Sequence, residues 1–148
     1  MRFLTPFLVF SLVSMLNTVA LGATFNVTNL TEFQSALTTA QSNDENNTIN
    51  VAAGTYNINT CLNYSPGGES YNHALTIKGA GSTILDGGNA VNIMKINTGN
   101  CDNDTSAITI SDITFQNGSL SSTNIAGGIS ISTDQANITI KGNAFLGN

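Results

Sequence analysis

The sequence is poor in charge and in the residues that carry most enzyme chemistry. Only 9% of its 148 residues are charged, with four Lys and Arg against nine Asp and Glu. It has no tryptophan, one histidine, two cysteines and two prolines. A net charge of -5 excludes the basic surface that nucleic acid requires, so no nucleic-acid partner is expected. Asn, Thr, Ser and Gly fill the polar positions, as is typical of an extracellular β-rich protein.

The first residues predict an export signal. One cation precedes an apolar core from Phe7 to Leu16, and small residues follow it. We expect a signal peptide over residues 1–22 and a mature domain over residues 23–148. The apolar core is shorter than the roughly 20 residues that span a bilayer, and an uncleaved anchor is the alternative. No later segment is apolar enough to cross a membrane.

The two cysteines, Cys61 and Cys101, are expected to form a disulfide bond, because exported chains meet an oxidising environment. Such a bond would close a loop of about 40 residues and stabilise the fold by about 3 to 4 kcal/mol. Two free thiols are the alternative. The spacing fits neither a metal site nor a CxxC redox motif.

One helix is predicted, from Leu30 to Gln41, where apolar residues recur at helical spacing. Asn29 and Glu32 make a capping box at its start. Beyond this helix the apolar period changes from helical to two, which predicts short strands that end in Gly or Asn. The second half of the chain is therefore expected to be built from β-strands.

The strand-like segments repeat at a nearly constant offset. Ile110 and Ile140 are 30 residues apart, as are Phe115 and Phe145, and Ile77 precedes Ile110 by 33 residues. A fixed period of this length is typical of solenoids and propellers. The strands are too short for a hairpin meander, so we expect each to pair with the equivalent strand of the next repeat. Phe115 should then stack on Phe145.

Several motifs resemble a known group. "INVAAGTY" at Ile49–Tyr56 and "LTIKGAGSTILDGG" at Leu75–Gly88 are similar to the first rungs of right-handed parallel β-helix proteins in the pectin-lyase-like superfamily. "FQNG", "GGIS" and the terminal "FLGN" resemble repeats of polymorphic outer-membrane proteins. The likeness covers about Thr24 to Asn148. It implies an all-β fold, a right-handed parallel β-helix (solenoid) with an N-terminal capping α-helix.

The resemblance also implies a location and a mode of assembly. Such proteins are secreted or exposed at the cell surface, including the outer membrane. No polar cap follows the last repeat, so residues 23–148 are expected to be the N-terminal part of a β-helix domain truncated at its C-terminal end. An uncapped coil presents unpaired strand edges, and self-association through it is a further expectation.

No catalytic residue, metal ligand or cofactor-binding residue is predicted. Members of the superfamily that cleave pectic polymers use clustered aspartates with a basic residue, whereas this chain has no arginine after Arg2 and its acids are scattered. Asp102 and Asp104 are the closest pair of aspartates. Calcium needs six to eight oxygen ligands, so a solvated loop is the preferred interpretation of this pair. Asp86 is interpreted as a turn residue that bonds its own backbone.

The single histidine and the tyrosines are further candidates for a site. His73 lies near Glu69 and Tyr71, but no nucleophile stands in a recognisable context, and a loop histidine without a role is preferred. Tyr56, Tyr64 and Tyr71 are candidates for stacking on sugar rings. Packing within the first rung is the preferred interpretation of Tyr56.

Two functions remain open on the sequence. The first is a secreted or cell-surface scaffold for binding and adhesion, with carbohydrate or a host component as its partner. The second is a polysaccharide lyase or glycoside hydrolase of the pectin-lyase-like superfamily whose active site lies outside this segment. We expect no cofactor, and the absence of catalytic groups favours the scaffold over the enzyme.

Overall fold

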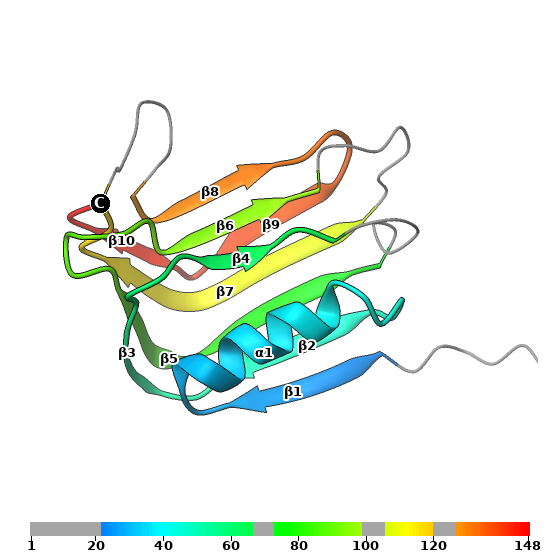
Figure 1. The fold of residues 1–148 in the computed structure, drawn as a ribbon, viewed down its shortest axis with the longest axis horizontal. Helices are drawn as coiled ribbons and strands as arrows, with labels where there is room; N and C mark the ends of the chain where they lie inside the picture. Colours follow the sequence, from blue (N-terminus) through cyan, green and yellow to red (C-terminus); the bar gives the residue numbers. More distant parts are fainter. Residues whose placement is uncertain (1–21, 67–72, 99–105, 120–126) are drawn as a thin grey trace, which may run out of the picture.

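A computed structural model describes residues 22–66, 73–98, 106–119 and 127–148, which form one helix and ten strands (Figure 1). The predicted signal peptide, apart from Gly22, lies outside the described residues. The elements in chain order are β1 (Ala23–Val27), α1 (Leu30–Ala40), β2 (Asn47–Val51), β3 (Gly54–Asn57), β4 (Leu62–Tyr64), β5 (Leu75–Asp86), β6 (Met94–Asn97), β7 (Ala107–Gln116), β8 (Ile129–Ser132), β9 (Asn137–Lys141) and β10 (Ala144–Leu146).

The strands are parallel and belong to two sheets. In the larger sheet β1, β2, β5, β7 and β10 lie in that order, with β3 also paired to β5 and β9 to β7. The smaller sheet has the order β4, β6, β8. Equivalent residues align across the strands of the larger sheet: Ile49 lies beside Ile77, Ile77 beside Ile110, and Ile110 beside Ile140. The offsets in the sequence therefore set the strand register.

The predicted stacking of Phe115 and Phe145 is confirmed. The two residues pair across β7 and β10, and their ring centroids are 5.2 Å apart with an interplanar angle of 8°. Phe115 is fully buried, whereas Phe145 is 47% exposed. The inner ring is therefore part of the core, and the outer ring covers it from one side.

Helix α1 begins where the capping box places it. The Asn29 side chain accepts a hydrogen bond from the Glu32 backbone N–H at 2.9 Å, and a Glu32 carboxylate oxygen accepts from the Thr28 N–H at 2.7 Å. The Thr28 N–H and hydroxyl both donate to the Glu32 carboxylate and lower the pKa of Glu32, because they favour its charged form. Successive turns of the helix present one buried apolar face, formed by Phe33, Ala36, Leu37 and Ala40.

The prediction of an all-β right-handed parallel β-helix with a capping helix is wrong. The described strands form two parallel sheets, and α1 packs against β1 and β2 of one and β4 of the other, an α/β-like arrangement (Figure 1). Phe33 and Leu37 are fully buried members of the same core as Ile49 and Ile77. A constant offset fixes the register between neighbouring parallel strands, but it does not determine how strands divide into sheets or where a helix packs.

Polar side chains stabilise the bends of the larger sheet. Thr83 is fully buried where β5 bends, and its hydroxyl accepts a hydrogen bond from the Ala80 N–H and lies 3.1 Å from the Val51 carbonyl oxygen. Asn143 takes the equivalent place two repeats later: it accepts from the Ile113 N–H and donates to the Ile110 carbonyl, both at 2.9 Å. Each bend is therefore hydrogen-bonded to the neighbouring strand.

No helix within the described ranges is long and apolar enough to cross a bilayer.

Candidate binding surfaces

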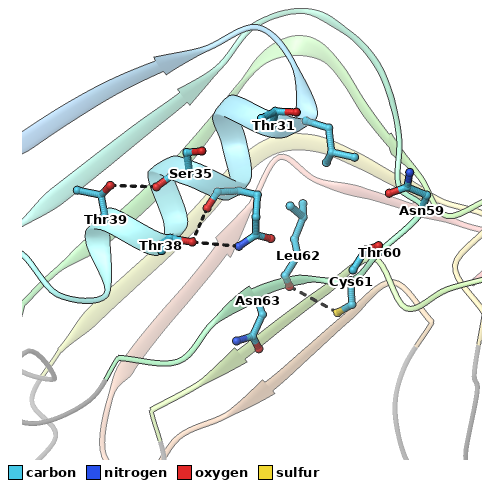
Figure 2. Close-up of a pocket in the computed structure, with 11 residues that line it drawn as sticks. Thr31, Ser35, Thr38, Thr39, Asn59, Thr60, Cys61, Leu62 and Asn63 are labelled. Carbon is cyan, nitrogen blue, oxygen red and sulfur yellow. Dashed lines mark hydrogen bonds between the residues drawn. The ribbon is translucent and has the colours of Figure 1, made fainter.

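A groove runs between α1 and the segment that leads into β4 (Figure 2). Its volume is about 720 Å³. Figure 2 shows Leu62 pointing toward the helix, and this buried side chain forms the floor of the groove. Leu30 is the other leucine of the lining. The other lining residues carry hydroxyl, amide or thiol groups, and none is charged: Thr31, Gln34, Ser35, Thr38, Thr39, Asn59, Thr60, Cys61 and Asn63. The groove therefore suits a neutral ligand with both polar and apolar groups.

The helix wall of the groove carries two hydroxyls that already donate a hydrogen bond within the helix and two that do not. Thr38 donates to the Gln34 carbonyl at 2.9 Å and Thr39 donates to the Ser35 carbonyl at 3.0 Å, so these two hydroxyls keep only their lone pairs for a ligand. Thr31 and Ser35 are exposed, and their hydroxyls make no hydrogen bond to another of the described residues. The wall thus offers both acceptors and donors.

The predicted disulfide bond between Cys61 and Cys101 is wrong for Cys61, which is a free cysteine at the end of this groove, while Cys101 lies outside the described residues. The Cys61 sulfur lies 3.3 Å from the Asn92 side-chain oxygen, which accepts its hydrogen bond. Burial raises the pKa of this thiol, against a smaller opposing effect of Lys95. Cys61 is therefore protonated at neutral pH and a poor nucleophile. An oxidising compartment alone does not bring two thiols together, because a bond also needs matching backbone geometry.

A row of five threonines crosses the opposite face of the larger sheet. Each is paired with the next across neighbouring strands: Thr24, Thr48, Thr76, Thr109 and Thr139. Side chains alternate between the two faces of a strand, so these threonines point away from the core that holds the adjacent isoleucines. Their hydroxyls make no hydrogen bond to another described residue, unlike those of Thr38, Thr39 and Thr83.

A second polar row runs beside the threonines, two residues further along each strand. It contains Asn26, Asn50, Lys78, Ser111 and Lys141. The Asn50 amide donates to the Asn26 side-chain oxygen at 3.0 Å. Where β5 begins to bend, Asn26, Asn50 and Lys78 line a shallow groove of about 380 Å³. This face carries two lysines, and neither of its two rows includes an acidic residue.

The described residues that were candidates for a site do not lie together. Tyr56 and Tyr64 are buried in the core, at 5% and 2% exposure, so neither can stack on a sugar ring. His73 is half-buried before β5. The Asp86 carboxylate accepts from the Gly88 N–H at 2.8 Å, which confirms it as a turn residue. The remaining candidates lie outside the described residues: Glu69, Tyr71, Asp102 and Asp104.

The described residues contain no group of three or more His, Cys, Asp or Glu side chains that could hold a metal ion. The groups that donate hydrogen bonds to the Asp86 carboxylate are uncharged. It accepts hydrogen bonds from the Gln116 and Asn117 amides at 2.7 and 3.1 Å. Its carboxylate therefore stabilises the turn after β5 and links this turn to the end of β7.

Comparisons with known proteins give no relative. No protein-family model, curated protein or solved structure matches the chain. The resemblance to the pectin-lyase-like superfamily and to polymorphic outer-membrane repeats is thus not supported. Short motifs built from Gly, Asn, Thr and Ile recur in many strand-rich sequences, because each residue type suits a turn or a strand on its own account.

Neither the groove beside α1 nor the threonine row was predicted from the sequence. The groove depends on packing between α1 and β4, which no local pattern encodes. The threonine row did have a signal, since each of its members directly precedes the Phe or Ile that aligns across the sheet, in "TFN", "TIN", "TIK", "TIS" and "TIK". The offset used for the isoleucines applies equally to the residues one position earlier.

Proposed function

We propose that this protein is an extracellular binding scaffold, secreted or held at the cell surface, and that it binds carbohydrate in the groove between α1 and β4. The observation that carries this proposal is the lining of the groove, where uncharged hydroxyl and amide groups surround the partly buried Leu30 above a buried floor residue, Leu62. Sugars present the matching chemistry, with hydroxyls at their edges and C–H groups on their faces. The composition and the predicted signal over residues 1–22 support the extracellular location.

The scaffold supplies rigidity to one wall of this groove. The floor residue Leu62 lies in β4, which pairs with β6, and β6 pairs with β8. The opposite wall is α1, held by its capping box and by its buried face. A preformed groove loses little conformational entropy when a ligand binds.

The groove is tested by filling it. Ser35→Trp places a large side chain in the groove without touching the core, because Ser35 is exposed. The purified chain is first screened on a glycan array, and the best ligand is then titrated by calorimetry. We expect Ser35→Trp to raise Kd by about tenfold or more, equivalent to about 1.4 kcal/mol.

The matched control is Ser132→Trp, at an exposed serine in β8, two strands from β4. It should leave Kd unchanged. A chain that binds no glycan would contradict the proposed function. Equal binding by wild type and Ser35→Trp would contradict the assignment to this groove.

A further inference from the structure

The threonine row differs from an ordinary exposed strand surface in its regularity. Five identical side chains stand side by side on five consecutive strands, with no interruption of the register. Parallel strands lie about 4.7 to 4.9 Å apart, so the row extends over about 19 Å with one repeated spacing. A ligand without a matching repeat would gain little from this arrangement.

The hydroxyls of the row are ordered in advance. Threonine is β-branched, so neighbouring strands restrict its χ1 angle and fix the directions of its hydroxyl and methyl groups. The five hydroxyls make no hydrogen bonds to other described residues. Their hydrogen-bonding capacity is left for something outside the chain, in an array that costs little entropy to align.

The surroundings of the row keep it accessible to a flat surface. On one side, two residues earlier in each strand or just before it, the positions are small or short, as at Ala74 and Ala107. The polar row with Lys78 and Lys141 runs along the other side. Neither the threonine row nor the polar row contains an aromatic residue on which a sugar ring could stack.

We propose that the threonine row binds ice. The oxygen repeat of the ice lattice along its a axis lies within a few tenths of an ångström of the strand spacing, so successive hydroxyls can occupy equivalent lattice positions. The methyl groups between them exclude loosely held water from the contact. This activity uses the face of the sheet opposite the core and does not depend on the groove beside α1.

The proposal is tested by measuring thermal hysteresis and the inhibition of ice recrystallisation with the purified chain. We expect the wild type to show both. Thr76→Tyr, in the middle of the row, should lose most of each activity, because its ring holds the lattice away from the neighbouring hydroxyls. Thr55→Tyr, at an exposed strand threonine outside the row, should keep both activities.

Circular dichroism verifies that each variant is folded. If Thr76→Tyr does not fold, Thr139→Tyr replaces it, since Thr139 is exposed in β9. A wild-type chain with neither activity up to its solubility limit would overturn the proposal. Equal losses in Thr76→Tyr and Thr55→Tyr would overturn it as well. Ser35→Trp, which fills the groove, should retain full activity, so a failure of glycan binding is distinguishable from a failure here.

Discussion

At the scale of single residues, a buried hydroxyl holds the bend of the longest strand. Thr83 is fully buried, and its oxygen lies within 3.1 Å of the Ala80 nitrogen and of the carbonyl oxygens of Val51 and Ala52. Valine has nearly the same shape but cannot form these bonds. The bend therefore depends on chemistry rather than on volume.

Thr83→Val is expected to lower the free energy of unfolding by about 1 to 3 kcal/mol, because it leaves buried backbone groups without a partner. Chemical denaturation followed by circular dichroism measures the change. The matched control is Thr55→Val, at an exposed threonine, which should change stability by less than about 0.5 kcal/mol. Equal stability of the two variants would contradict a structural role for the Thr83 hydroxyl.

Asp86 gives the protein a dependence on pH. Hydrogen bonds from Gln116, from the Gly88 N–H and from Asn117 lower the pKa of Asp86, since they favour the carboxylate. A group with a lowered pKa in the folded state stabilises the fold above its unfolded pKa, and this contribution is lost as the pH falls through the folded value.

We therefore expect the free energy of unfolding to fall as the pH is lowered below about 4, near the ordinary pKa of aspartate. Asp86→Asn should flatten this part of the profile while it preserves the size of the side chain. Denaturation at a series of pH values provides the measurement. Identical acid limbs for wild type and Asp86→Asn would show that other carboxyl groups are responsible.

At the scale of elements, local patterns predicted the helix well. The helix was expected from Leu30 to Gln41 and is found at Leu30–Ala40, with Gln41 as its C-cap. The capping box of Asn29 and Glu32 is also present. These features depend on side chains three or four residues apart, so the sequence contains all the information needed to locate them.

The pairing of strands was predictable for a similar reason, and their division into sheets was not. Aligning Ile77, Ile110 and Ile140 gives the register of β5, β7 and β9, because parallel neighbours with apolar inner faces must match in phase. The separation of β4, β6 and β8 into a second sheet depends on where the chain turns between strands. The position of α1 against both sheets depends on the whole core, and so does the free thiol of Cys61.

At the scale of the whole molecule, the burial of apolar groups is uneven. Within the described ranges, the large apolar residues that remain exposed lie in β9 and β10: Ile138, Ile140, Phe145 and Leu146. Their exposed fractions range from 36% to 53%, whereas the equivalent residues of β7, such as Ile110 and Phe115, are fully buried. An apolar surface beside an open strand edge favours contact with other molecules.

The double variant Ile140→Lys with Phe145→Lys is expected to reduce association at high concentration and to weaken the binding of a hydrophobic dye. Both effects follow from like charge on a surface that was apolar. Light scattering and dye fluorescence provide the measurements. Thr55→Lys together with Ser132→Lys adds the same charge at exposed polar positions and serves as the control. Equal changes in both double variants would assign the effect to net charge alone.

The pairing of β5 with β7 also determines how the molecule responds to force. The two parallel strands share eight residue pairs, four on each side of the bend, and their register shifts at the bend. A pull along the strands loads these hydrogen bonds together in shear, whereas a pull across them opens the pairs one after another. The direction of the load therefore decides how strongly the sheet resists separation. Among the described strands, β5 and β7 form the longest pair, so this pair is expected to give the greatest resistance to a pull along the strands.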